Sequence, residues 1–413
     1  MSPRRLDLQI LCKSGASIER ILASWETLPL IVRFKGSPKT KSLPTNIPIA
    51  LCHPDRVREI DLGLTNTTVG LIVDAIKQPF QTLERIRITI KDATGPSLLF
   101  RNAFLGGSSP RLRELALDGI SFPFSEIKQV ISTNNLVELH LSRIPKNGYF
   151  SADALVTALS TSAQLRHLHV SFHDPTFLPI QSITSPPPRR TTFPSLVFLE
   201  FHGASEYLEE FVSLVDFPSL DIITIKLFNQ IIFEIPQFCR SIQLLNLFRF
   251  PTEAEITLST KLVTIYFRQK PMTRRRPRGI KHRECSLSTV CERLDWKLYF
   301  VTQVSGQLSL LLKNVNTLII SQDNGMPSGE DVDPKQWLEL FQPFTHVQTL
   351  RVAGQLVPDI ALALVTEDMT AGVLPKLEKL FFAREFRTPA AEEAARQFVA
   401  MRKLSGHYIY LSF

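Results

Sequence analysis

The sequence lacks the features that mark membrane and secreted proteins. No apolar run approaches the roughly 18 residues needed to cross a bilayer, and Asp7 and Lys13 interrupt the N-terminus, which makes it unlike a secretory signal peptide. The five cysteines are odd in number and scattered over 413 residues. Such cysteine usage favours reduced thiols over a disulfide framework. We therefore expect a cytoplasmic or nuclear protein with no membrane partner.

Motifs of catalysis and of cofactor binding are missing as well. There is no glycine-rich dinucleotide-binding fingerprint, no P-loop, no nucleophile elbow and no His-Glu-x-x-His pair. His282, Cys285 and Cys291 lie close in sequence, but their spacing and the absence of a fourth ligand are poor for zinc. We expect a protein that is not an enzyme and that holds no cofactor or metal.

What the sequence does contain is a repeated pattern: an apolar residue, two others, an apolar residue, one other, and an apolar residue. Twelve segments match it, and most begin 20 to 32 residues apart. They begin at Val57, Leu83, Leu112, Leu136, Leu165, Leu196, Leu220, Ile242, Leu262, Val315, Val347 and Leu377. This spacing predicts an α/β fold, a leucine-rich-repeat-like solenoid of irregular coils. Its parallel strand ladder lies on the concave face, with helices and loops outside. One coil cannot bury its apolar row alone, so neighbouring coils must stack.

The ends of the chain read as caps on this solenoid. Residues 1–50 predict a strand, a helix and a strand at 6–11, 17–25 and 30–34, and residues 51–413 form the solenoid. A C-terminal cap at 390–413 combines a helix at 390–404 with a strand at 408–413. Further helices are expected at 152–161, 206–215 and 334–341, and a Pro-rich loop at 179–194.

The positive net charge belongs to one loop. The formal net charge is +8, and residues 268–283 contain eight cations and no acid, so the rest of the chain is neutral. The candidate contact residues in this basic loop are Lys270, Arg274, Arg275, Arg276, Arg278, Lys281 and Arg283. Two interpretations stay open. One is a solvated excursion from a coil; the other is an import signal or a contact with nucleic acid or an acidic partner. No aromatic residue lies between Lys270 and Arg283, which disfavours single-strand binding by stacking.

Histidines gather on three successive predicted strands. Residues between the apolar positions face the concave side, and there His140, His169 and Glu200 share one position of the pattern. We expect them in one row on adjacent parallel strands, with His167 and His202 beside it. The candidate partner-binding patch comprises Glu114, Glu138, His140, His167, His169, Glu200 and His202.

Two interpretations of this patch stay open, a solvated polar face and a binding surface whose charge changes near neutral pH. A flat row seldom converges on one metal ion. Farther along, Leu244, Phe248, Tyr266, Ile319 and Phe381 occupy the same class of position and predict an apolar stripe suited to a protein ligand.

Short phrases along most of the chain resemble one family in particular. They include Asp55-Arg56-Val57, Phe104-Leu105-Gly106-Gly107-Ser108-Ser109-Pro110, Ile144-Pro145-Lys146-Asn147-Gly148-Tyr149, Glu206-Tyr207-Leu208-Glu209, Phe228-Asn229-Gln230, Gln336-Trp337-Leu338-Glu339-Leu340-Phe341 and Leu404-Ser405-Gly406. In this order they resemble the repeat domain of the F-box proteins expanded in mushroom-forming fungi. The resemblance implies repeats that hold a protein for ubiquitination, and an N-terminal F-box that binds a Skp-type adaptor.

The chain departs from that family at the F-box. No three-helix segment opens with a Leu-Pro-Glu-like phrase, so we do not expect these residues to bind a Skp-type adaptor. The sequence therefore predicts a non-enzymatic protein–protein interaction scaffold that resembles the substrate-recognition part of F-box ubiquitin-ligase adaptors. The alternative is a nuclear platform protein that contacts nucleic acid or acidic partners through the basic loop. The protein partner on the concave face is unknown.

Overall fold

The structure is a computed structural model, and it divides the chain into two compact units. One unit contains Met1–Gly203 with Ser213–Ser219, and the other contains Ala204–Val212 with Leu220–Phe413. The described residues are 6–7, 18–37, 42–92, 104–173, 190–245, 251–269, 284–323, 332–365, 372–386 and 388–413. Each unit has its own run of strands.

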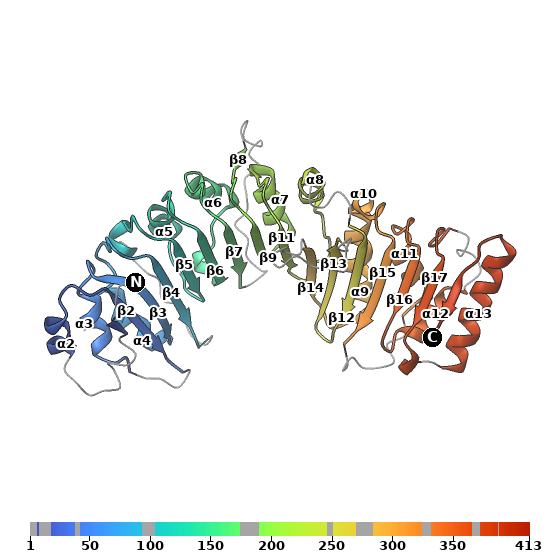
Figure 1. The fold of residues 1–413 in the computed structure, drawn as a ribbon, viewed down its shortest axis with the longest axis horizontal. Helices are drawn as coiled ribbons and strands as arrows, with labels where there is room; N and C mark the ends of the chain where they lie inside the picture. Colours follow the sequence, from blue (N-terminus) through green and yellow to red (C-terminus); the bar gives the residue numbers. More distant parts are fainter. Residues whose placement is uncertain are drawn as a thin grey trace. The chain divides into compact units, whose positions relative to one another are not determined.

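In the first unit, all neighbouring strands of the main sheet are parallel and follow the chain order (Figure 1). The strands are β1 (Leu6–Asp7), β2 (Leu30–Lys35), β3 (Val57–Leu64), β4 (Arg85–Ile90), β5 (Glu114–Asp118), β6 (Glu138–Ile144), β7 (His167–Phe172) and β9 (Phe198–Gly203). The connections contain α2 (Ile18–Ser24), α3 (Asn46–Leu51), α4 (Asn66–Val73), η1 (Phe104–Gly107), α5 (Phe124–Ile131), η2 (Lys146–Gly148) and α6 (Ala152–Leu159). A separate parallel pair joins β8 (Thr191–Thr192) to β10 (Val215–Asp216).

The apolar positions of the pattern form the core of this unit. On β4, Ile86 and Ile88 are fully buried, whereas Arg85 and Arg87 are exposed. The same alternation recurs from strand to strand because side chains of a strand point to opposite faces in turn. Each fully buried aliphatic side chain contributes about 1.5–3 kcal/mol relative to an exposed one. The pattern thus fixes which face of the sheet is covered and which is left open.

Polar side chains tie each coil to the one before it. Thr82 Oγ1 lies 2.8 Å from the carbonyl oxygen of Asp55 and 3.0 Å from that of Val57. Asn135 and Ser162 contact backbone carbonyls of their preceding coils in a similar way. Because the tie is made by Thr, Asn or Ser rather than by one repeated residue, the coils differ in detail. This agrees with the expectation of irregular coils.

The second unit interrupts its parallel ladder with an antiparallel meander. Its strand order is β11, β14, β13, β12, β15, β16, β17, β18, and the β12–β13 and β13–β14 pairs are antiparallel. The strands are β11 (Ile222–Leu227), β12 (Glu253–Leu258), β13 (Leu262–Arg268), β14 (Glu284–Val290), β15 (Thr317–Gln322), β16 (Thr349–Val352), β17 (Lys379–Phe382) and β18 (Tyr410–Ser412). The helices are α7 (Ser205–Leu214), α8 (Pro236–Leu244), α9 (Leu294–Gln307), α10 (Ser309–Leu312), α11 (Pro334–Phe341), α12 (Val357–Ala363) and α13 (Pro389–Leu404), with η3 (Arg384–Phe386) before α13.

One of the twelve predicted ladder strands is wrong. The segment that begins at Ile242 starts within the last turn of α8 instead. Ile242 is buried together with Phe238 and Cys239 at the spacing of one face of a helix, and Pro236 favours a helix start at that point. The sequence pattern in turn missed β12, which alternates in burial, and β14, in which five consecutive residues are buried; both lack the full spacing.

At the two ends, the structure has strands and helices where the sequence predicted them, while their role as caps stays a prediction. The predicted strand, helix and strand near the N-terminus correspond to β1, α2 and β2, and β1 pairs with β2 in parallel. The C-terminal helix and strand correspond to α13 and β18. The three internal helices correspond to α6, α7 and α11.

The two compact units do not divide the chain at residue 50, where the sequence analysis placed the boundary between the N-terminal cap and the solenoid. That boundary stays a prediction. Most of the Pro-rich loop 179–194, and residues 270–283 of the basic loop, lie outside the described residues. Among the helices that are described, none combines the length and apolar character needed to span a membrane.

Candidate functional site

The site lies on the open face of the first unit, which we define as the alternate positions of β3 to β9 that the core does not bury. The register of the strands places these positions in rows that run across the sheet. Neighbouring strands are about 4.8 Å apart, so side chains in one row are near neighbours. The rows therefore bring together residues that are about 25 to 30 positions apart in sequence.

The predicted histidine row is present. His140 pairs with His169 across β6 and β7, and His169 pairs with Glu200 across β7 and β9. The rings of His140 and His169 stack with centroids 6.0 Å apart. His169 Nδ1 lies 2.9 Å from Oε2 of Glu200. The register prediction is thus confirmed, while binding by this row remains to be tested.

Two imidazoles also face the Glu138 carboxylate. Oε2 of Glu138 lies 3.6 Å from Nε2 of His140, and Oε1 lies 3.3 Å from Nδ1 of His167. Partial burial, and next the neighbouring His169 ring, lower the pKa of His140 below its usual value. His140 is therefore neutral at pH 7, and an uncharged ring does not balance the carboxylate.

At the β9 end of the patch, the polar side chains have hydrogen-bond partners within the chain. The hydrogen bond from His169, together with the charges of nearby histidines, lowers the pKa of Glu200, although partial burial opposes this shift. His202 Nδ1 lies 3.2 Å from Oγ of Ser171, and the ring of His167 meets that of Phe198 edge-on. Glu200 is thus ionised at neutral pH and held in place by its neighbour.

An arginine–glutamate network on β2 to β5 extends the patch beyond the predicted residues. Glu59 and Glu114 are both buried, and Arg85 bridges them, with its guanidinium 3.9 Å from Glu59 and 2.5 Å from Glu114. Arg33 adds a second partner to Glu59 at 3.1 Å, and Arg87 adds one to Glu114 at 2.8 Å. Buried carboxylates need such partners, because desolvation otherwise disfavours their charge.

The sequence analysis missed the β3 and β4 members of this network, although a signal was present. Glu59, Arg85 and Arg87 occupy the same between-apolar positions as the predicted residues, but in the first two coils of the ladder. Glu114 was predicted for the patch, and it proves to be among its most buried members. The predicted patch is therefore one end of a longer charged surface.

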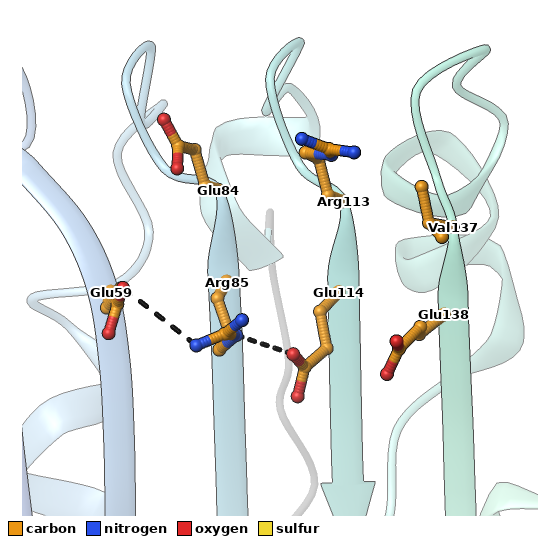
Figure 2. Close-up of a pocket in the computed structure, with 7 residues that line it drawn as sticks. All are labelled: Glu59, Glu84, Arg85, Arg113, Glu114, Val137 and Glu138. Atoms are coloured by element: carbon orange, nitrogen blue, oxygen red, sulfur yellow. Dashed lines mark ion pairs between the residues drawn. The ribbon is translucent and has the colours of Figure 1, made fainter. Parts of the chain in front are cut away.

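A pocket of about 290 Å³ opens where the network meets the patch. Figure 2 shows its lining: Glu59, Glu84, Arg85, Arg113, Glu114, Val137 and Glu138. In the figure, Arg85, Glu114 and Glu138 lie side by side in one row, while Glu84, Arg113 and Val137 lie one residue before the start of each strand. The pocket contains charges of both signs and one apolar side chain.

Arg143, near the end of β6, has an unusual backbone conformation. Arg143 lies on β6 where the pairing with β7 loses its register, and its φ is +45°. Its guanidinium bonds to Asp118 at 2.6 Å and to the carbonyl of Ile90 at 2.8 Å. A positive φ is costly for a residue with a side chain, so these two bonds stabilise the irregularity and link three strands.

The apolar stripe predicted farther along the chain is not formed as expected. Leu244 lies in α8 rather than on a strand, and Phe248 lies outside the described residues. Tyr266, Ile319 and Phe381 do share one row of the second unit, but Glu255 and Arg351 separate them. The guanidinium of Arg351 lies 5.3 Å from the centre of the Phe381 ring. The row is therefore mixed in character.

Of the basic loop 268–283, the structure describes only residues 268 and 269. Arg268 at the end of β13 pairs with Glu255 and Glu284, whereas the seven candidate contacts of the basic loop lie outside the described residues. Within the part of the chain that is described, no group of three or more His, Cys, Asp or Glu side chains is arranged to hold a metal ion.

The strand register defines the class of the fold as a leucine-rich-repeat-like solenoid with a mostly parallel ladder and helices outside it. No protein-family model matches the sequence, and a search of curated protein sequences found no match. Among solved structures, the chain is similar to the leucine-rich repeat-containing protein LegL7 from Legionella pneumophila. The identity is 11%, the match covers 90% of this chain and 96% of that one, and the TM-score is 0.30. The assignment of the fold rests on the register of the strands and not on this likeness.

Proposed function

We propose that the chain is a non-enzymatic scaffold that binds a protein partner on the open face of its first unit. The observation that carries this proposal is the alignment of His140, His169 and Glu200 in one row on three adjacent strands. These side chains do not fill the core, and they lie on an extended, regular surface. Stacked-repeat proteins use such surfaces to bind other macromolecules.

The finer form of this proposal comes from the family resemblance. The repeats would hold a protein for ubiquitination, as the substrate-recognition part of F-box adaptors does. The open face would then select the substrate through its row of imidazoles and carboxylates. Specificity on such a frame depends on the side chains, which differ among proteins of one fold.

Affinity capture from cells of the source organism, read by quantitative mass spectrometry, tests the scaffold proposal. The patch variant carries His140→Ala, His169→Ala and Glu200→Gln. A matched control carries Lys128→Ala, Asp153→Ala and Thr157→Ala, which are exposed positions on the helices of the same unit. The proposal expects proteins that are lost with the patch variant and retained with the control. Equal capture by both variants would remove the open face as the docking surface.

A second candidate function rests on the concentration of charge at residues 268–283. Eight cations in one loop, with no acid among them, favour contact with nucleic acid or with an acidic partner. In this alternative the solenoid is a nuclear platform and the basic loop is its binding element. Removal of the loop separates the two candidate functions. Binding through the loop is lost when the loop is removed and is kept in the patch variant, whereas binding on the open face shows the reverse.

A further inference from the structure

Side chains of opposite charge alternate across three neighbouring strands at the pocket. On the fourth strand the alternation stops, because a second carboxylate follows the first. Glu59 on β3, Arg85 on β4 and Glu114 on β5 are register partners, and each carboxylate contacts the arginine between them. The next residue of the row is Glu138 on β6, which is the register partner of Glu114. Like charges directly opposite one another on adjacent strands destabilise a sheet. A cation is missing from the pattern at this point.

Glu138 also differs from the other carboxylates of the pocket in its partners. Glu59, Glu84 and Glu114 each pair with at least one arginine. In the described part of the chain, Glu138 pairs with histidines and with no arginine or lysine. Its side chain is 34% exposed, so it is accessible at the pocket that opens beside it.

The nearest unused cation does not fill the missing place. Arg113 lines the pocket one residue before Glu114 (Figure 2). It is exposed and forms no ion pair within the described residues, with Glu138 or with any other carboxylate. Metal binding is disfavoured too, because the described His, Cys, Asp and Glu side chains form no cluster suited to a metal ion. Among the described residues, no arginine or lysine therefore occupies this place in the row.

We propose that this pocket receives a lysine or arginine side chain from a protein partner, with Glu138 as its counter-ion. This inference rests on the proposed function and names the chemistry of the partner segment that contacts β5 and β6. The basic group lies between Glu114 and Glu138 and continues the alternation of the row. An arginine suits the place best, since its planar fork can contact two carboxylates at once.

His140, which lies beside Glu138, makes this contact sensitive to acid. The charged and titratable groups that face His140 are Glu138 on its own strand, Glu114 on β5 and His169 on β7. When His140 is protonated, it becomes an internal counter-ion of Glu138 and competes with the cation of the partner. Binding of a basic segment should therefore weaken as the pH falls and this ring gains its proton.

The test uses a fluorescein-labelled hexa-arginine peptide as the probe, with the full chain at pH 7.5 and low ionic strength, and reads fluorescence anisotropy. Glu138→Gln should weaken binding about two- to fivefold, the effect of losing one partly exposed charge pair. The control Glu339→Gln removes an exposed carboxylate on α11 of the other unit and should leave the Kd unchanged. An equal Kd for the wild type and Glu138→Gln, or no saturable binding by the wild type, overturns the inference.

A second variant separates binding from folding. Glu138→Lys places a cation of the chain itself where the alternation lacks one, so it should abolish probe binding while keeping or raising the melting temperature. A lower melting temperature with unchanged binding would instead assign Glu138 a structural role and overturn the inference.

The affinity-capture experiment distinguishes a failure of the scaffold proposal from a failure of the basic-segment inference. If the patch variant loses its captured proteins but Glu138→Gln binds the probe as the wild type does, the scaffold proposal stands and the basic-segment inference fails. If the patch variant and Glu138→Gln both behave as the wild type does, both proposals fail.

Discussion

Nδ1 of His169 lies 2.9 Å from Oε2 of Glu200 on the adjacent parallel strand. The two residues are 31 positions apart in sequence, one coil of the solenoid. Their contact shows how the ladder assembles a polar surface from single residues contributed by successive coils. The same register that buries Leu168 beside Leu199 brings this pair together on the opposite face.

The His169–Glu200 contact predicts a specific dependence of stability on pH. Because the pKa of Glu200 is lowered in the folded chain, its ionised form stabilises the fold above the unfolded pKa of about 4.3. This contribution is lost as the pH falls through the folded pKa. Glu200→Gln should cost less than about 1 kcal/mol at pH 7, since the pair is partly exposed. The difference should shrink as the pH falls below the unfolded pKa of Glu200. Urea unfolding at pH 7 and at successively lower pH values measures it, and a constant difference would contradict the assignment.

The two stacked histidines should contribute little to stability. His140→Ala with His169→Ala removes side chains of the open face, so we expect a loss below about 1 kcal/mol. Leu168→Ala is the matched control on β7, because Leu168 is fully buried next to His169. That change should cost about 2–5 kcal/mol. Chemical unfolding of the three proteins compares them, and a histidine variant as unstable as Leu168→Ala would show that the row belongs to the core.

The basic loop should be separable from the fold. Its ends, Arg268 and Glu284, are register partners in the antiparallel β13–β14 pair, so a short Gly-Ser connection in place of residues 270–283 can join the two strands. We expect a melting temperature close to that of the wild type and a large loss of heparin affinity, because seven of the eight clustered cations are removed. Unfolding of the variant would assign the loop a structural role, and unchanged heparin elution would place the cation-dependent binding elsewhere.

The cysteines should differ sharply in reactivity. Burial raises the pKa of Cys239 to about 12 and also raises that of Cys285, so both remain protonated and shielded at pH 8. Cys52 is exposed. Iodoacetamide labelling read by peptide mass spectrometry should modify Cys52 in the native protein, and Cys239 and Cys285 only after denaturant is added. Rapid native labelling of Cys285 would contradict its placement in the core between β13 and β11.

The ladder could be predicted from the sequence because its signal is local and repeated. Each strand shows the same spacing of buried residues, and the register follows when the segments are aligned. For this reason the row of His140, His169 and Glu200 was predictable before any coordinates. The helices α6, α11 and α13 were predictable as well, since each combines apolar periodicity with a recognisable start.

The meander in the second unit could not be predicted in this way. Antiparallel pairing of β13 with β12 and β14 depends on contacts that the spacing pattern does not encode. The segment from Ile242 shows the opposite error, since Ile242 continues the buried face of α8 to which Phe238 and Cys239 belong. The counter-ions of the open face were missed for a third reason. Ion pairs such as Arg87 with Glu114 become visible only when the rows are laid side by side.

The most direct test of the docking surface is site-specific photo-crosslinking in cells of the source organism. A benzoyl-phenylalanine is placed at position 140 on the open face, or at position 157 on the exposed side of α6, and adducts are identified by mass spectrometry. If the open face binds a partner, position 140 gives a discrete protein adduct that position 157 does not. Adducts at position 157 with none at position 140 would contradict a docking surface on the strands and would place the partner on the helices.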